Sequence, residues 1–289
     1  MDGVPYEFID RVFTKLPFND VHKFHNLLSN EWYIQSTLWT EVARVYATKI
    51  KQFTMNIILS ANGCISYDAG KNLIFENVDD RFVRIKKLTI TATNRLPTVN
   101  RIPNLPEFIR FLSRFDFEAI DVYKEASNGA DGELEDLLDE FMKAGFKHSS
   151  LTLSYCPATE NYLKYHLKSG ELKSLTFTEN GLPTPLELKD EIVAFACRPN
   201  FEALTCYFAS LEMDCLKQIV AYWKAVETSS KRVRLTVMIA SGRHDFQNQF
   251  IELLAVSTES VQFRRTIEGV PLVAQCYSEN STMKFTIDL

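Results

Sequence analysis

The sequence predicts an α/β protein in which a small helical module precedes a solenoid of strand-helix units. The first observation behind this prediction is a short strand-like segment that recurs at a nearly constant spacing from residue 87 onward. The second is a helical pattern between these segments, and the third is a pair of amphipathic helical patterns before residue 47. A near-constant period of about 30 residues is typical of repeat proteins, whose units pack on their neighbours.

The recurring segment has an aliphatic residue, a polar residue and another apolar residue, as in Leu88-Thr89-Ile90. This alternation predicts a β-strand. The aliphatic residues of the seven segments lie at positions 88, 120, 151, 175, 204, 235 and 261, so the steps are 32, 31, 24, 29, 31 and 26 residues. Helical patterns lie between them at residues 105–115, 134–144, 159–168, 186–197, 211–226 and 246–256. Strand followed by helix, repeated in this way, predicts a parallel sheet with helices on its outer side.

One unit matches the leucine-rich-repeat template, with Leu172-x-x-Leu175-x-Phe177-x-x-Asn180-x-Leu182. The array from residue 87 to 289 therefore resembles a degenerate leucine-rich-repeat-like solenoid with long, helix-bearing repeats. A doubly wound α/β sheet is the alternative. The regular period and the lack of a Gly-rich first turn argue against that alternative.

The first 39 residues contain two amphipathic patterns. Residues 4–16 place Phe8, Ile9, Val12, Phe13 and Leu16 on one helical stripe. In the second pattern, Asp20 stands where a helix can be capped, and the apolar positions that follow are Val21, Phe24, Leu27 and Leu28. Two short helices with this much apolar surface need a partner, either in the rest of the chain or in another protein.

Pro5, Glu7, Val12, Phe13, Leu16, Asp20 and Val21 fall in register with the F-box pattern, and Trp32 lies one residue later than in that pattern. Residues 1–46 therefore resemble an F-box, the module by which substrate receptors join a Skp-type adaptor of a cullin-RING (SCF) ubiquitin ligase. The opening Met-Asp-x-Val-Pro before an α/β repeat region is similar to nematode F-box families. The resemblance implies an adaptor-binding face made of Val4, Pro5, Phe8, Ile9, Val12, Phe13, Leu16, Val21, Phe24, Leu28 and Trp32.

Residues 47–86 differ from both neighbouring regions. Strand-like alternation occurs at 53–60, 64–67 and 72–76, and Asn62-Gly63 is a strong signal for a tight hairpin turn. These residues are expected to form a β connector between the F-box-like module and the repeat domain at 87–289. No segment rich in Pro, Ser or Gly separates the parts, so we expect a rigid joint.

Composition limits the classes of function. No stretch approaches the ~18 consecutive apolar residues that a membrane span requires, and the N-terminus lacks the pattern of a signal peptide. A formal net charge of -5 argues against nucleic-acid binding. The six cysteines show no paired spacing, which favours reduced thiols and a location in the cytoplasm or nucleus.

The sequence offers little for catalysis, a metal or a cofactor. Gly63 and Gly70-Lys71 have the wrong spacing for a phosphate loop, and His22 and His25 lack further metal ligands. The acidic run within 133–140 alternates with leucines, as on the solvated face of a helix. No enzymatic activity, cofactor or metal site is expected.

The leading expectation is a non-catalytic substrate receptor that docks the adaptor through its N-terminus and holds an unidentified client protein on the repeat domain. The alternative is a repeat-type interaction scaffold whose N-terminal hairpin is purely structural. Client contacts are expected on the concave face of the sheet, where alternate strand residues point away from the helices. The expected client-binding residues are Asp121, Tyr123, Thr152, Thr176, Thr205 and Tyr207.

Overall fold

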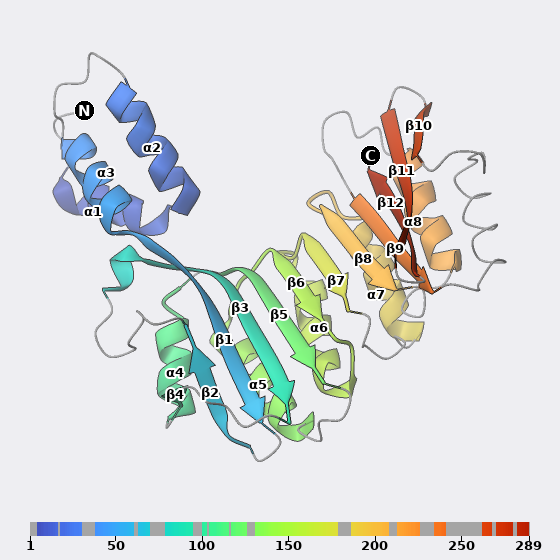
Figure 1. Ribbon diagram of the computed structural model, residues 1–289, viewed down its shortest axis with the longest axis horizontal. Helices are drawn as coiled ribbons and strands as arrows, with labels where there is room; N and C mark the ends of the chain where they lie inside the picture. Colours follow the sequence, from blue (N-terminus) through green and yellow to red (C-terminus); the bar gives the residue numbers. More distant parts are fainter. Residues whose placement is uncertain are drawn as a thin grey trace.

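The computed structural model, shown as a ribbon in Figure 1, combines a bundle of helices at the N-terminus with a long sheet. It describes residues 5–16, 18–30, 38–60, 63–69, 79–94, 100–102, 104–115, 117–125, 131–178, 186–207, 213–225, 234–240, 262–267, 270–279 and 282–288. The expected strand at 72–76 and helix at 246–256 lie outside these residues.

Three helices, α1 (Tyr6–Lys15), α2 (Phe18–Asn30) and α3 (Leu38–Lys49), form the N-terminal module. The sequence patterns predicted only the first two of these helices. The third helix supplies Val42, Ala43 and Tyr46 to a separate core that also contains Ile9 and Phe13 of α1. The ring centroids of Phe13 and Tyr46 lie 5.4 Å apart. The module thus has a small core of its own, and its last helix continues past residue 46.

The described strands form one mixed sheet of 12 strands, in the order β10-β11-β12-β9-β8-β7-β6-β5-β3-β1-β2-β4. The strands at the N-terminal end are β1 (Lys51–Ser60), β2 (Ile65–Asp68), β3 (Val83–Thr93) and β4 (Asn100–Arg101), and the middle holds β5 (Phe117–Lys124), β6 (Ser150–Leu153), β7 (Ser174–Phe177), β8 (Ala203–Tyr207) and β9 (Arg234–Ala240). The last three are β10 (Gln262–Ile267), β11 (Val270–Glu279) and β12 (Thr282–Asp288).

The central strands β1, β3 and β5 to β9 are parallel, and each lies beside the preceding parallel strand of the chain. A doubly wound sheet reverses its strand order at a switch point. No such reversal occurs among the described parallel strands. The expected parallel arrangement is therefore confirmed for the six segments from residue 88 to residue 235.

The six aliphatic residues that define the sequence period lie directly opposite one another in this sheet. They are Leu88, Ile120, Leu151, Leu175, Leu204 and Leu235, and all are fully buried. Burying a side chain of this size contributes about 2 kcal/mol. The sequence period thus corresponds to the register of one apolar row.

The seventh segment of the period, near residue 261, does not continue the parallel array, so this part of the prediction is wrong. It overlaps β10, which pairs antiparallel with β11, while β9 pairs antiparallel with β12. Two residues, 268–269, separate β10 from β11, and two residues, 280–281, separate β11 from β12. Connections this short permit hairpins, because a parallel crossover requires about a dozen residues or more.

The connector region joins the same sheet. Its first strand, β1, pairs parallel with β3 and antiparallel with β2. Gly63 has a φ of 75°, a conformation that favours glycine, and its N–H donates to the Ser60 carbonyl at 2.9 Å. The structure therefore bears out the antiparallel strand pair around Asn62-Gly63, and β1 extends the parallel strands by one.

The helices of the repeat region alternate with the strands: α4 (Leu105–Leu112), α5 (Asp131–Ala144), α6 (Pro157–Ser169), α7 (Leu186–Ala196) and α8 (Met213–Ala225). Local sequence defines their ends. The Asn104 side chain accepts from the Glu107 N–H at 3.3 Å and caps α4, and Gly170 ends α6 with a φ of 77°.

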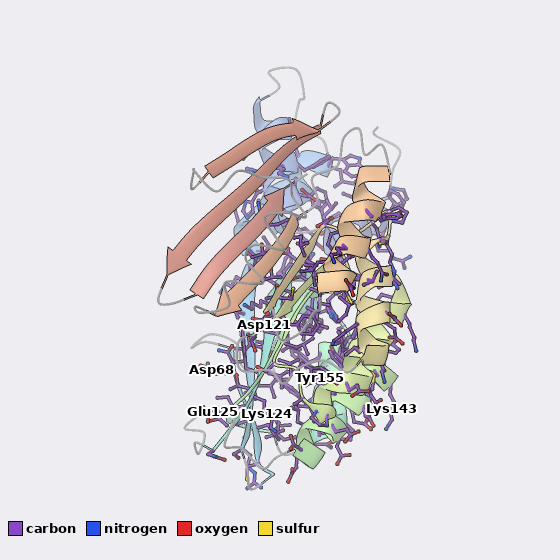
Figure 2. The ribbon with its side chains drawn as sticks, turned by 90° about the vertical axis from the view of Figure 1, so that its right-hand side faces the viewer. Asp68, Asp121, Lys124, Glu125, Lys143 and Tyr155 are labelled. Atoms are coloured by element: carbon purple, nitrogen blue, oxygen red, sulfur yellow. The ribbon has the colours of Figure 1, made fainter. Side chains whose placement is uncertain are left out.

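Figure 2 shows these helices packed on one face of the sheet. No described helix covers the opposite face of the parallel strands, which we call the open face. Within the described part of the chain, no helix combines the length and apolar character that a membrane crossing would need.

Candidate functional site

Helix α1 has more apolar surface than the N-terminal core encloses. Ile9 and Phe13 are fully buried, whereas Phe8 is 55% exposed. Pro5 is also exposed, and Val12 is partly buried. Residues three or four apart share a helix face, so Pro5, Phe8 and Val12 form a row beside the buried one. We call these three residues the exposed α1 row.

The remaining residues of the expected adaptor-binding face fall into different environments. Val21 is fully buried in the N-terminal core, and Leu16 and Phe24 pack against that core. Val4, Trp32 and the side chain of Leu28 lie outside the described residues. Ile9, Phe13 and Val21 cannot touch a partner directly in this conformation. Their role here is to hold the module together.

Sequence reasoning did not select Tyr6, Leu27 or Leu38 as site residues. These side chains are 47%, 63% and 40% exposed. Leu27 follows Phe24 by three positions on α2, so helical spacing could have identified it. No pattern in the sequence predicts that Tyr6 and Leu38 are exposed.

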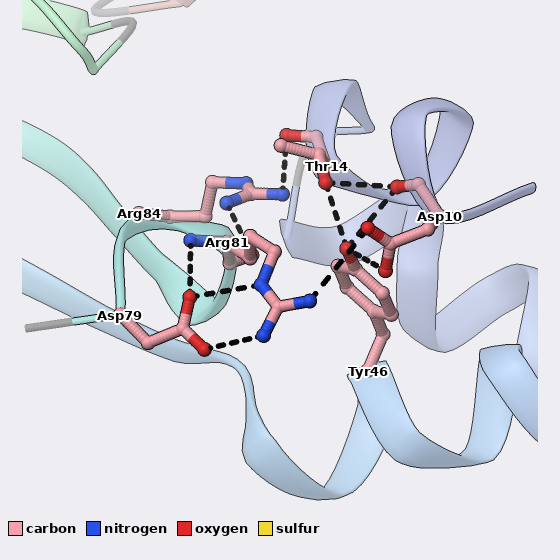
Figure 3. A network of polar contacts seen from close by, with 6 residues as sticks. All are labelled: Asp10, Thr14, Tyr46, Asp79, Arg81 and Arg84. Atoms are coloured by element: carbon pink, nitrogen blue, oxygen red, sulfur yellow. Dashed lines mark hydrogen bonds and ion pairs between the residues drawn. The ribbon is translucent and has the colours of Figure 1, made fainter. Parts of the chain in front are cut away.

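A polar network connects the N-terminal module to the sheet (Figure 3). The Tyr46 hydroxyl donates to the Asp10 carboxylate at 2.9 Å and lies 2.7 Å from the Thr14 hydroxyl. Burial raises the pKa of Tyr46 to about 12. Tyr46 therefore stays neutral and holds α3 to α1. These contacts join residues more than 30 positions apart, and no sequence pattern predicted them.

The same network includes residues just before β3. The Arg81 guanidinium donates two hydrogen bonds to Asp79, at 3.0 and 2.8 Å, which lowers the pKa of that carboxyl. One nitrogen of Arg81 also lies 3.8 Å from an Asp10 carboxylate oxygen. The neighbouring ring of Phe82 packs against Tyr46 with centroids 5.0 Å apart. The joint between module and sheet thus combines ionic and aromatic contacts.

A row of polar residues crosses the open face. Thr89, Asp121, Thr152, Thr176, Thr205 and Thr236 are direct register partners from β3 to β9. Four of the expected client-binding residues, Asp121, Thr152, Thr176 and Thr205, thus lie in one row. It continues through the register positions Asn56 on β1 and Thr286, Gln275 and Gln262 on β12, β11 and β10. Gln262 is the polar position of the seventh segment of the sequence period, whereas β1, β11 and β12 lie outside that period, so the sequence did not predict Asn56, Gln275 and Thr286 in this row.

The residues expected to bind a client are not equally accessible. Thr152, Thr176 and Thr205 are partly exposed, whereas only 2% of Asp121 is exposed. Lys87 forms an ion pair with Asp121, and the Tyr123 hydroxyl donates to Asp121 at 2.9 Å. Burial, followed by this carboxylate, raises the pKa of Tyr123 to about 12. Asp121 therefore orients Tyr123 and Lys87 at the surface.

Tyr207 follows Thr205 by two positions on β8, where it pairs with Met238 of β9, but its side chain is outside the described residues. Tyr123 is likewise two positions after Asp121, on β5. The strands β6 and β7 lie between them. Ser154 and Thr178 follow these two strands, and their hydroxyls form a hydrogen bond of 2.7 Å. The surface between the two tyrosines is rich in hydroxyl groups.

On the helix side, the structure brings together His148 and His166, which are isolated from each other in the sequence. Their ring centroids are 4.1 Å apart, and the Tyr162 ring lies 4.5 Å from that of His166. Burial lowers the pKa of His148 to about 2 and that of His166 to about 4. Both imidazoles are therefore neutral at pH 7.

Among the described residues, no cluster of three or more His, Cys, Asp or Glu side chains could hold a metal ion. The thiol of Cys206 is deeply buried, which raises its pKa to about 12 and keeps it protonated. The features that stand out are two surfaces, the exposed α1 row and the open face. Comparisons with protein-family models, with curated proteins and with solved structures find no match for this chain.

Proposed function

We propose that this protein is a non-catalytic substrate receptor of an SCF ubiquitin ligase. In this proposal the N-terminal helices dock a Skp-type adaptor, and the open face holds a client protein. The observation that carries the proposal is the exposed α1 row, which stays at the surface although the neighbouring row is fully buried. Pro5 and Phe8 belong to the segment that resembles an F-box, and apolar side chains beside a packed core are suited to docking.

We further propose that the parallel region is a degenerate leucine-rich-repeat-like solenoid. Two features support this proposal. The parallel strands follow one another in chain order, and the helices between them cover one face of the sheet. In such an array the open face offers a surface shared by many repeats. A receptor of this kind would act in the cytoplasm or nucleus.

The second candidate is an interaction scaffold whose N-terminal helices are purely structural. Complete burial of Ile9, Phe13 and Val21 within the chain favours this candidate. The two candidates differ in what they require of Phe8. Its side chain is half exposed and contributes little to the core, so the scaffold gives it no binding role.

The first prediction is that replacing Phe8 by Ala weakens adaptor binding without unfolding the module. Aromatic anchors at the centre of an interface typically contribute about 2 kcal/mol, or roughly a 30-fold change in Kd. The measurement is titration of a purified Skp-type adaptor against the full chain and the F8A variant by calorimetry. The matched control is Tyr165→Ala, which removes another aromatic ring, 41% exposed, from α6.

The receptor proposal requires tight binding by the unmodified chain and by Y165A, together with weaker binding by F8A. Circular dichroism must show the same helix content in all three proteins. Equal adaptor affinity in F8A and the unmodified chain would remove the exposed α1 row from the interface. No binding by any of the three would leave the scaffold as the supported function.

A further inference from the structure

Arg84, the second residue of β3, makes five guanidinium hydrogen bonds, three to carbonyls of the N-terminal module and two to carbonyls next to it in the sequence. Its Nε donates to the Leu16 carbonyl at 3.2 Å, and its Nη2 donates to the Phe13 and Thr14 carbonyls at 3.0 and 2.7 Å. Its Nη1 donates to the Arg81 and Val83 carbonyls at 3.1 and 2.8 Å. A guanidinium has five N–H donors in a fixed plane, and five contacts are present here.

The three carbonyls on the module side belong to the C-terminal end of α1. The last carbonyls of a helix have no partner within the helix, and the helix dipole favours a positive charge beside them. The Phe13 carbonyl also accepts from the Leu16 N–H at 3.3 Å. Arg84 adds three hydrogen bonds and a positive charge from a position 68 to 71 residues away in the sequence. It therefore caps α1 from the sheet.

The two carbonyls on the other side belong to residues that lead into β3. The guanidinium is planar and rigid. Its Nε and Nη2 bind the end of α1 and its Nη1 binds residues 81 and 83, so the group restricts the angle between α1 and the start of β3. The contacts of Arg81 with Asp10 and of Phe82 with Tyr46 lie at the same joint. In Figure 3, Arg84 and Arg81 both extend from the strand side toward the helices.

We infer that Arg84 is a positioning residue that fixes the orientation of the N-terminal module relative to the sheet. The exposed α1 row then points in one direction with respect to the open face. A fixed angle would hold a client at a constant place relative to the adaptor, and this use of the joint rests on the proposed function. The orientation itself is a property of the isolated chain.

The test measures the distribution of distances between spin labels on the two parts. Noncanonical amino acids carry the labels at Asn26 on α2 and Asp136 on α5, both exposed, so that the native cysteines are unchanged. Pulsed electron paramagnetic resonance is applied to the full chain, to Arg84→Ala and to Arg84→Lys. The control is Arg110→Ala, which removes an exposed arginine from α4.

The full chain and R110A are expected to show one narrow peak. Both Arg84 variants are expected to show a broad distance distribution in place of the narrow peak. Alanine has no donor, and the three donors of a lysine ammonium cannot span both sets of carbonyls. Hydrogen exchange must show that the core amides of α1 to α3 remain protected in at least one of the two variants. That protection excludes unfolding of the module as the cause.

Three results would overturn the inference. A narrow peak in both Arg84 variants would show that other contacts set the angle, and a broad distribution in the full chain would show that no angle is set. Loss of protection of α1 to α3 in both variants would make Arg84 a structural cap only. Adaptor titration of the same proteins keeps the two proposals apart: an unmodified chain that binds no adaptor but keeps its narrow peak contradicts the proposed function alone.

Discussion

Neighbouring residues of α1 have different roles because the helix has two apolar rows and only one is covered. Phe13 contacts Phe24 and Tyr46 with ring centroids 5.5 and 5.4 Å away, so its ring is part of the core of the module. Phe8, five positions earlier, has more than half of its surface in solvent. Apolar side chains on one helix thus pack into the core in one row and stay partly exposed in the other.

His148 and His166 show a comparable dependence on surroundings. Both are ordinary polar residues in the sequence, and both are almost fully buried in the structure. Both nitrogens of His148 and the Nε2 of His166 have no hydrogen-bond partner among the residues that the structure describes. Protonating either ring would place a charge in an apolar region, which is the reason for their lowered pKa values.

A second prediction follows at the scale of these residues: stability falls as pH drops below about 6.5, the ordinary pKa of histidine. The folded pKa values are lowered, so below that pH the unfolded chain binds protons that the folded chain does not. Stability is fully present above the unfolded pKa and is lost toward the folded value of about 4 for His166. Each buried histidine contributes a loss of about 1.4 kcal/mol per pH unit in this window.

The measurement is urea unfolding of the full chain and of a His148→Leu, His166→Leu variant at pH 7, 6 and 5. The double variant is expected to lose less stability between pH 7 and pH 5, because it lacks the two buried histidines. The carboxylates that also titrate at low pH are the same in both proteins, so their effect cancels in the comparison. His22→Gln on α2 is the control, because it removes a partly exposed imidazole that is not part of the buried histidine pair. Equal pH slopes in the full chain and the double variant would contradict the prediction.

At the scale of elements, the strands of the repeat region present two unlike faces. The residues toward the helices that define the sequence period are aliphatic and buried. On the open face, Thr89, Thr152, Thr176 and Thr205 are partly exposed, whereas Asp121 and Thr236 are buried. The alternation arises because successive strand side chains point to opposite faces. Tyr123 is the largest described side chain that the sequence analysis selected on the open face, and Asp121 fixes its hydroxyl.

The third prediction is that Tyr123→Ala lowers the capture of client proteins by the full chain. Tyrosine provides a large contact area and a hydroxyl, and such residues are enriched at binding hot spots. Affinity capture from a cell lysate, quantified by mass spectrometry, compares the full chain with Y123A. Tyr165→Ala on the helix side is the control.

Circular dichroism and melting temperature must be unchanged in Y123A for the comparison to count. A second variant, Tyr123→Phe, keeps the ring and removes the hydrogen bond to Asp121, so it separates contact area from orientation. If Y123A captures the same clients as the full chain, recognition uses another surface. The C-terminal strands are then the next region to test, from residue 271 to 289.

At the scale of the whole molecule, the N-terminal module continues directly into the sheet. Helix α3 ends at Lys49 and β1 begins at Lys51, and Figure 1 shows the module beyond the N-terminal ends of β1 and β3. In the sheet, β4 forms one edge, and β10 to β12 lie at the other. The two candidate surfaces therefore belong to one continuous structure joined at residues 79–84.

The fourth prediction concerns the separation of the two binding functions. The test uses a shortened chain that begins at Lys51 and therefore lacks α1 to α3. It also carries Phe82→Ser, because removal of Tyr46 would otherwise leave the Phe82 ring without its aromatic partner. We expect this chain to lose the adaptor and the cullin subunits and to retain its clients, as measured by quantitative affinity capture. The full-length F8A variant is the control, because it leaves the module in place. Clients lost together with the adaptor would indicate that the module takes part in client binding.

The sequence by itself determined the repeated part of this protein. The period of Leu88, Ile120, Leu151 and their successors predicted the strands, and the structure places these residues opposite one another in the sheet. The Thr row was predictable for the same reason, because a residue adjacent to a buried strand position must point to the other face. Helix ends such as Asn104 and Gly170 depend on nearby residues, which also makes them local features.

Only the tertiary structure decided which apolar residues are covered and which polar residues meet. The burial of Ile9 and Phe13 depends on α3, the contact between His148 and His166 depends on how α6 packs, and Arg84 reaches a helix end about 70 positions earlier. The reversal of direction after β9 likewise depends on pairing with β12. Each of these features joins residues that are distant in sequence, and local periodicity contains no information about which distant elements pack together.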